Sequence, residues 1–131
     1  TRQAACKNPE YAYKYALNID KCARKDTREA VYEDLYFVYL YALDIDKGPE
    51  DVMRKYICKD PKYAYKYALH INKKARGDTR KAVCKNPEYA YYYARDVDKD
   101  YHKDTYKAIL DTKYEKRYNK FLNSKMKEEI I

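Results

Sequence analysis

A block of about 26 residues occurs four times in this chain, with copies beginning at Cys6, Tyr32, Cys58 and Cys84. The clearest copies, the first, third and fourth, begin CKNPEYAYKYAL, CKDPKYAYKYAL and CKNPEYAYYYAR. Repeats of this length are typical of stacked supersecondary units that share one core between neighbours. Thr1 to Ala5 match the end of a block, so the chain starts inside a repeat.

This frame predicts a single repeat domain over residues 1–131. Its parts are the repeats 6–31, 32–57, 58–83 and 84–109, and a C-terminal capping helix at 110–131. Asp111 is expected to start that helix, with Tyr114, Tyr118, Phe121 and Leu122 on the face that covers the last repeat.

Each block contains two predicted helix starts. Before the first helix, an Asn or Asp precedes a proline at Asn8-Pro9, Asp60-Pro61 and Asn86-Pro87. Before the second, shorter helix, we expect N-caps at Asp26-Thr27, Asp78-Thr79 and Asp104-Thr105. In repeat two, Gly48-Pro49-Glu50 is expected to start this helix slightly earlier.

Alternating tyrosines in the first segment also allow a β-strand. Tyr11, Tyr13 and Tyr15 have the period of a strand. The helical caps, the recurring alanines and the length of the segment favour a helix instead. The sequence therefore predicts an all-α fold, a short α-solenoid of four helix-turn-helix repeats with a capping helix.

The tyrosines and cysteines that recur at fixed positions are expected to be packing residues. Tyr13 and Tyr15 have counterparts in every copy, although some tyrosines could instead stack on unpaired bases. Cys6, Cys58 and Cys84 are expected to lie beyond disulfide reach of one another, and Cys22 to be exposed. Such thiols favour a reducing, cytoplasmic compartment, and the absence of a long apolar run argues against a membrane span.

Catalysis has little support in the sequence. The two histidines, His70 and His102, are not equivalent positions, and the glycines are isolated. Asp96, Asp98 and Asp100 have the start of a calcium-loop spacing but lack its later glycine and glutamate. We therefore expect no enzyme, no cofactor and no metal.

A variable stripe runs along the first helix of each repeat, opposite the expected core face. Its members are Glu10/Lys14/Asn18, Tyr36/Leu40/Asp44, Lys62/Lys66/His70 and Glu88/Tyr92/Asp96. Such a row can form an extended recognition surface, although ordinary drift of solvated residues would also produce it. The expected protein-binding residues are Lys14, Leu35, Tyr36, Leu40, Lys66, His70 and Tyr92.

Repeat two departs most from the pattern, because it has Leu35 where the other copies have proline and Tyr36 and Leu40 where they mostly have charges. Exposed apolar residues beside tyrosine predict a protein contact or self-association. Packing against the C-terminal helix would explain them equally well.

Basic residues form a second recurring pattern in a chain of net charge +8. The members are Lys21, Lys47, Lys73 and Lys99 after the first helix, and Arg28, Arg54 and Arg80 on the second. Two such ladders could bind a nucleic-acid backbone. The lysines could equally compensate the negative ends of helix dipoles.

The repeated PEYAYKYA and KYAYKYA, followed by an acid-Thr-Arg-x-Ala-Val segment, resemble tandem tyrosine/alanine-rich helical repeats in uncharacterised proteins of bacteriophages and large DNA viruses. The resemblance covers residues 6–109 and implies a viral or phage origin, but no defined activity. The variable stripe, the basic ladders and repeat two lead to three expected functions. These are a module that binds a host protein or assembly, a protein that binds single-stranded RNA or DNA, and a self-associating structural component.

Overall fold

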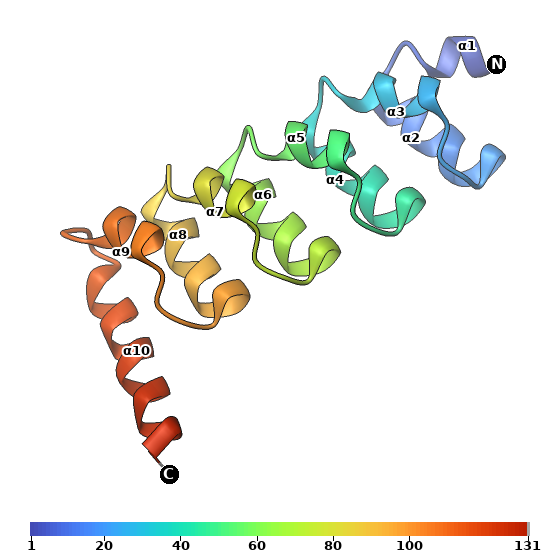
Figure 1. Cartoon of the computed structure of the whole chain (residues 1–131). Helices are drawn as coiled ribbons and strands as arrows, with labels where there is room; N and C mark the ends of the chain where they lie inside the picture. Colours follow the sequence, from blue (N-terminus) through green and yellow to red (C-terminus); the bar gives the residue numbers. More distant parts are fainter. Residues whose placement is uncertain (131) are drawn as a thin grey trace.

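The computed structural model describes residues 1–130, and within that range the chain consists of helices joined by turns, without strands. Successive helix pairs lie side by side in one row, as Figure 1 shows. The expected all-α repeat architecture is therefore confirmed.

Each repeat contains an A helix, which is an α-helical segment continued by a π-helical turn, and a shorter B helix. The A helices are α2 (Pro9–Tyr15) with η1 (Ala16–Asp20), α4 (Leu35–Tyr41) with η2 (Ala42–Asp46), α6 (Pro61–Tyr67) with η3 (Ala68–Asn72), and α8 (Pro87–Tyr93) with η4 (Ala94–Asp98). The B helices are α3 (Lys25–Val31), α5 (Asp51–Ile57), α7 (Gly77–Val83) and α9 (Lys103–Ile109). Before them lies α1 (Arg2–Ala5), and after them α10 (Glu115–Ile130).

The A helices start where the sequence predicts. The Asn8 side chain accepts a hydrogen bond from the Tyr11 N–H at 3.2 Å, and Asp60 and Asn86 cap their helices in the same way. In repeat two, Asp34 caps the helix, so Leu35 occupies the first helical position without needing the proline of the other copies.

Each A helix ends on a lysine in the left-handed region of the backbone. Lys21, Lys47, Lys73 and Lys99 have φ between 55° and 57°. The Lys21 N–H donates to the Ala16 carbonyl at 2.8 Å and closes the π-helical turn. A non-glycine residue in this conformation costs about 1 kcal/mol, and a positive charge beside the exposed carbonyls offsets part of that cost.

The B helices start two residues earlier than the Asp-Thr pairs predict, so those predicted caps are wrong. Arg24 is the N-cap of α3, and Arg76 and His102 take the same place in α7 and α9. Gly48-Pro49-Glu50 starts α5 as expected, since Glu50 is its N-cap, but this start lies in the same frame as in the other repeats and is not earlier than theirs. At Arg24, Glu50 and Arg76, a tyrosine hydroxyl of the next repeat binds the main chain of the cap residue. At His102, the ring Nδ1 of the cap residue itself accepts from the Asp104 N–H.

The core is built from small A-helix residues and branched B-helix residues. Ala12, Ala16 and Val31 are fully buried, as are their counterparts Ala42, Ile57, Ala64, Ala68, Val83, Ala90, Ala94 and Ile109. The alanines let neighbouring A helices approach, and large side chains fill the remaining space. Tyr41, Tyr67 and Tyr93 are fully buried in that space, as expected for packing tyrosines.

The C-terminal helix covers the last repeat. Tyr118 of α10 is fully buried in a cluster with Ala90, Tyr91 and Ile109. Asp111 does not start the helix as predicted, because it is left-handed (φ 62°) and α10 begins at Glu115. Figure 1 shows α10 at the end of the row. Within residues 1–130, no helix has the length and apolar character to cross a membrane.

Candidate functional site

The predicted arginine ladder lies at the junctions between repeats. Arg28 donates to Asp46 of the next repeat at 2.6 Å, and Arg80 donates to Asp98 at 2.5 and 3.2 Å. Arg2 makes the equivalent pair with Asp20. These guanidinium groups are turned toward the stack and paired with carboxylates, so their recurrence is explained by holding repeats together.

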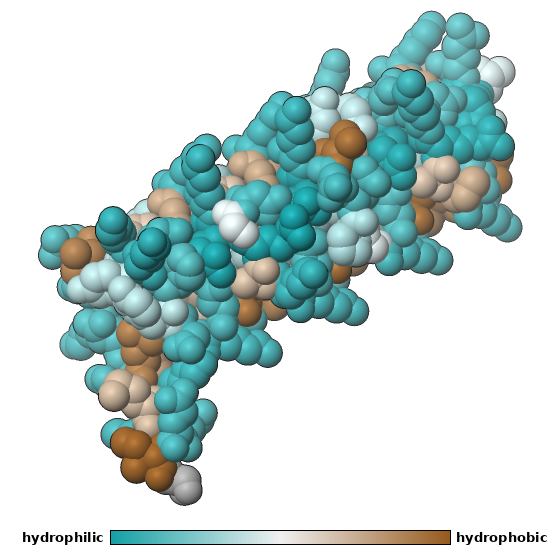
Figure 2. All heavy atoms as spheres, in the orientation of Figure 1, coloured by the Kyte–Doolittle hydropathy of each residue, from teal (hydrophilic) through white to brown (hydrophobic). Residues whose placement is uncertain are grey.

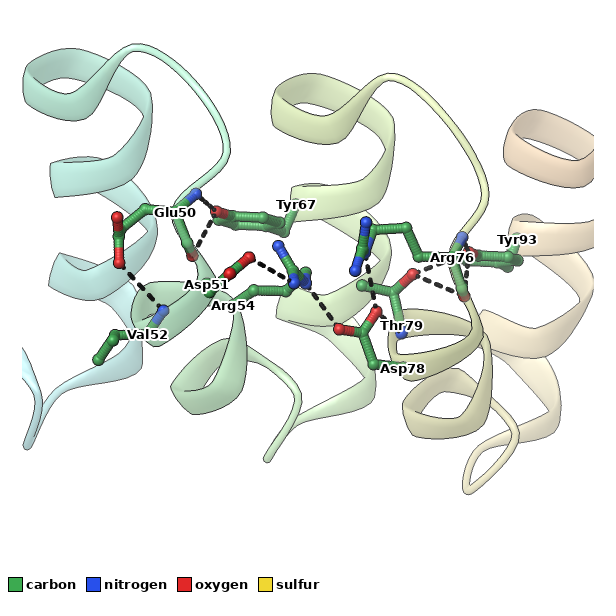
Figure 3. Close-up of polar contacts among 9 residues, drawn as sticks. All are labelled: Glu50, Asp51, Val52, Arg54, Tyr67, Arg76, Asp78, Thr79 and Tyr93. Atoms are coloured by element: carbon green, nitrogen blue, oxygen red, sulfur yellow. Dashed lines mark hydrogen bonds and ion pairs between the residues drawn. The ribbon is translucent and has the colours of Figure 1, made fainter.

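The junction between repeats two and three departs from this pattern. Asn72 stands where the other repeats have aspartate, and its buried amide has no hydrogen-bond partner among the described residues. Arg54, which is buried, instead pairs with Asp78 at 2.6 Å and with Asp51 at 2.8 Å (Figure 3). The predicted nucleic-acid contact of these arginines would therefore require their existing ion pairs to open.

The ion pair with Arg54 also affects the pKa of the Asp78 carboxyl. Burial by itself would raise the pKa of the Asp78 carboxyl, but hydrogen bonds from Arg54 and from the Thr79 N–H hold that pKa below its usual range. Asp78 is consequently ionised at neutral pH and available to Arg54.

At each junction between repeats, a tyrosine hydroxyl of one repeat forms hydrogen bonds with the main chain of the turn in the preceding repeat. The Arg76 N–H donates to the Tyr93 hydroxyl at 3.0 Å, and Thr79 Oγ1 lies 2.8 Å from the same oxygen. Figure 3 shows this cluster beside the equivalent contact of Tyr67 with Glu50. In that copy Met53 replaces the threonine, so Tyr67 binds the main chain alone.

The recurring cysteines are half-buried at the ends of B helices and all four cysteines are free. Burial raises the pKa of Cys58 and of Cys84 to about 11. Because a thiolate is the reactive form, these two thiols are poor nucleophiles at neutral pH. Cys22 is exposed, as expected.

Some residues of the variable stripe form hydrogen bonds across the junctions between repeats. The Tyr13 hydroxyl donates to Asp44 of the next repeat, and the Tyr65 hydroxyl donates to Asp96, each at 2.5 Å. Burial, followed by these hydrogen bonds, raises the pKa of Tyr13 and of Tyr65 to about 12. Asp44 and Asp96 are thus junction residues as well as surface residues.

Repeat two exposes less apolar surface than expected. Leu35 and Leu40 are half-buried and pack against the core, so the expectation that they are exposed is wrong. Both leucines belong to the larger core cluster, whereas α10 packs in a separate cluster with repeat four, so α10 is not their partner. Tyr36 is 50% exposed and packs edge-on against Phe37, with ring centroids 5.1 Å apart.

In repeat three, basic side chains continue the variable stripe on which Tyr36 lies. The Lys66 ammonium lies 5.9 Å from the Tyr39 ring and 6.0 Å from the Tyr63 ring, which holds it half-buried. Lys62 and His70 are exposed on the same stripe. At the start of the row, Lys14 is exposed and pairs with Glu10 at 3.0 Å.

An aromatic cluster occupies the stripe in repeat four. Tyr92 is half-buried, lies against the rings of Tyr65 and Tyr89, and donates to Glu88 at 3.1 Å. The Arg95 guanidinium lies 5.1 Å from the Tyr92 ring and pairs with Asp96. Arg95 is a residue of this cluster that was not predicted, although it stands where the other copies have leucine.

The four left-handed lysines are exposed along the edge formed by the turns. Lys21 and Lys47 line one cleft of about 770 Å³ between repeats one and two. Lys73 and Lys99, with Lys74, line a smaller cleft of about 260 Å³ between repeats three and four. The structure thus places the predicted lysines along one edge of the stack, and Arg28 lines the same cleft as Lys21 and Lys47.

Most of the face shown in Figure 2 is hydrophilic, and apolar residues on it occur in separate spots. Within the described part of the chain, no group of three or more His, Cys, Asp or Glu side chains is placed to hold a metal ion. All three calcium-like aspartates already have other partners: Tyr65 and Arg95 for Asp96, Arg80 for Asp98 and Lys125 for Asp100.

Comparison with known proteins adds no family to this description. No family model matches the chain, and no curated protein and no solved structure matches it either. The candidate surface is therefore interpreted from its own residues.

Proposed function

We propose that this chain is a non-enzymatic interaction module that binds an acidic surface of a protein through the outer stripe of its A helices. The resemblance of its repeats to those of phage and large-DNA-virus proteins supports a host protein or assembly as the partner. The net charge of +8 supports an acidic one.

The observation that carries this proposal is the half-exposed Tyr36 on repeat two, with basic side chains on the next repeat. Tyrosine is enriched among residues that dominate binding energy, because it offers a large rigid apolar area and a polar tip. Lys62 is exposed one step along the stack and supplies positive charge near that anchor, and His70 is exposed on the same stripe. Lys66 is already held between two rings, so its ordering cost on binding is reduced.

The test is a comparison of partners retained from nuclease-treated host lysate by the wild-type chain and by Tyr36→Ala. Tyr101→Ala is the matched control, since Tyr101 is similarly exposed (52%) but lies in the turn before α9. We expect at least about tenfold weaker retention of one partner by Tyr36→Ala alone. Equal retention by both variants would refute the stripe as the binding surface. Circular dichroism of each variant checks that the fold is intact.

Nucleic-acid binding is the second candidate, and the exposed lysines that recur along the turn edge favour it. Lysines at successive junctions suit contact with a phosphate backbone, which needs charge but little geometry. Electrophoretic shifts with single-stranded RNA and DNA at two salt concentrations test it, with Lys73→Gln/Lys99→Gln as the variant. Binding that is absent at low salt, or unchanged in this variant, excludes the turn edge as a nucleic-acid site.

A further inference from the structure

The cleft of about 770 Å³ between repeats one and two has an exposed cysteine, Cys22, in its wall. This cysteine does not recur, because the other copies have Gly48, Lys74 and Asp100 at its position. Gly48 lines the same cleft from repeat two, and a β-carbon there would meet no neighbouring heavy atom within 4 Å. The cleft between repeats three and four is smaller, at about 260 Å³, and has Lys74 in its wall. The wide space beside a thiol is therefore a feature of the first junction.

The same cleft is lined by a buried carboxylate that has one unpaired oxygen. The Asp46 side chain is 6% exposed and its Oδ1 accepts from Arg28, but its Oδ2 has no hydrogen-bond partner among residues 1–130. The equivalent Asp98 binds Arg80 through both oxygens. Burial raises the pKa of the Asp46 carboxyl, and the hydrogen bond from Arg28 offsets this only in part. Asp46 is therefore suited to a second, cationic N–H donor that comes from a ligand.

The charges around the cleft balance one another. The basic lining residues are Lys21, Arg28 and Lys47, and the acidic ones are Asp44, Asp46 and Glu50. Asp44 and Glu50 already accept hydrogen bonds within the chain. Lys21 and Lys47 are exposed and can bind a carboxylate. A small zwitterion, with its ammonium on Asp46 and its carboxylate on a lysine, therefore fits the cleft better than a ligand of one charge.

We propose that Cys22 is a modification site, which forms a mixed disulfide with an α-amino-acid thiol held in this cleft. The co-reactant is the symmetric disulfide of that thiol. The Cys22 thiolate attacks one sulfur of this disulfide, and the S–S bond breaks. The other half leaves as a thiolate and takes up the proton that Cys22 lost, so no further oxidant is needed. Cys58 and Cys84 react slowly by comparison, because burial raises their pKa to about 11.

The experiment incubates the reduced full chain with one of four small disulfides and follows adduct formation at Cys22 by mass spectrometry with peptide mapping. Cystine and glutathione disulfide carry both an ammonium and carboxylates in each half, cystamine carries only the ammonium, and dithiodipropionate carries only the carboxylate. The reference protein is Cys22→Ser/Lys74→Cys, which has its cysteine at the same turn position beside the smaller cleft.

The measured quantity is the rate at Cys22 divided by the rate in the reference protein, since this ratio removes the intrinsic reactivity of each disulfide. We expect the ratio to be at least about tenfold higher for a zwitterionic disulfide than for cystamine or dithiodipropionate. A faster reaction with cystine would assign the site to a free amino acid, and a faster reaction with glutathione disulfide to a peptide.

Two variants test the cleft itself. Asp46→Asn removes the carboxylate, and Gly48→Lys introduces the residue that repeat three has at this position, with an ammonium that competes for Asp46. Both are expected to remove the preference for zwitterions, and circular dichroism checks that each variant is folded. Gly48→Lys keeps the pair of Arg28 with Asp46, so it remains a valid test where Asp46→Asn loosens the junction.

Equal ratios for all four disulfides would overturn the proposal. A preference that persists in Gly48→Lys, or adducts that form at the other cysteines as fast as at Cys22, would overturn it as well. These rates are measured on the chain alone, so they are independent of whether Tyr36 binds a partner.

Discussion

Arg80 and Asp98 form a two-point ion pair across the junction between repeats three and four, with N–O distances of 2.5 and 3.2 Å. Both side chains are largely shielded from solvent, at 16% and 7% exposure. A pair in this position joins a B helix to the π-helical turn of the following A helix. Its chemistry is repeated at two other places in the stack, and it provides the first test of what holds the repeats together.

Asp98→Asn is expected to lower the free energy of unfolding by about 2 kcal/mol, because it leaves a shielded guanidinium without its carboxylate. The measurement is urea denaturation at neutral pH. Asp100→Asn makes the same chemical change two residues away at an exposed carboxylate and is expected to have little effect. Equal effects of the two variants would show that the pair contributes little to the junction.

Asn72→Asp is expected to raise the free energy of unfolding by about 1 kcal/mol, because it replaces a buried, unpartnered amide with the carboxylate found at the other junctions. Arg54 would then have the partner that Arg28 and Arg80 have. Urea denaturation of the wild type, Asn72→Asp and Asn72→Asp/Arg54→Met measures the coupling. A stabilisation that persists without Arg54 would contradict the restored ion pair.

Tyr93→Phe is expected to lower the free energy of unfolding by about 1.5 kcal/mol, since it removes the partner of both the Arg76 N–H and the Thr79 hydroxyl. Tyr67→Phe is the internal comparison and is expected to cost less, because Met53 replaces the threonine there. Thermal melting of the two variants ranks them. A larger loss of stability in Tyr67→Phe than in Tyr93→Phe would mean that the threonine hydroxyl contributes little to this contact between repeats.

Alkaline pH is expected to destabilise the fold through Tyr13 and Tyr65. Their folded pKa of about 12 lies above the value of about 10 in an unfolded chain. Their contribution is therefore complete below about pH 10 and is lost as the pH rises from there toward the folded pKa. Urea denaturation at about pH 9 and about pH 11, with tyrosinate absorbance, measures the loss. The Tyr13→Phe/Tyr65→Phe variant should lose less; an equal loss would assign the effect to other groups.

The repeat frame and the A-helix starts could be predicted because their signals are local. Asn8 and Asp60 cap helices within three residues of themselves. The start of α3 could not be predicted in this way, because the Tyr41 hydroxyl, 17 residues away, binds the cap residue Arg24. A contact between repeats decides that boundary, and no window of neighbouring residues contains it.

The candidate site was predicted only in part for the same reason. Recurrence alone could not tell whether Arg28 faces phosphate or a neighbouring repeat. The sequence did contain a distinguishing signal, since an aspartate stands 18 residues after Arg2, Arg28 and Arg80. Leu40 was expected on the surface from the register of one helix, but its burial depends on what the adjacent repeats place beside it.

The tyrosine–aspartate contact occurs at the first and third junctions, between Tyr13 and Asp44 and between Tyr65 and Asp96, whereas the second junction has Tyr39 against Tyr63 and Lys66. A single repeat therefore cannot be removed or exchanged without changing the kind of contact at a junction. Recombination that removes repeats two and three together leaves Tyr13 facing Asp96 and Arg28 facing Asp98, a junction of the existing kind. Removal of repeat two alone places Tyr13 against His70 and Arg28 against Asn72. A pair of repeats, and not a single one, is therefore the unit whose removal leaves a junction of an existing kind.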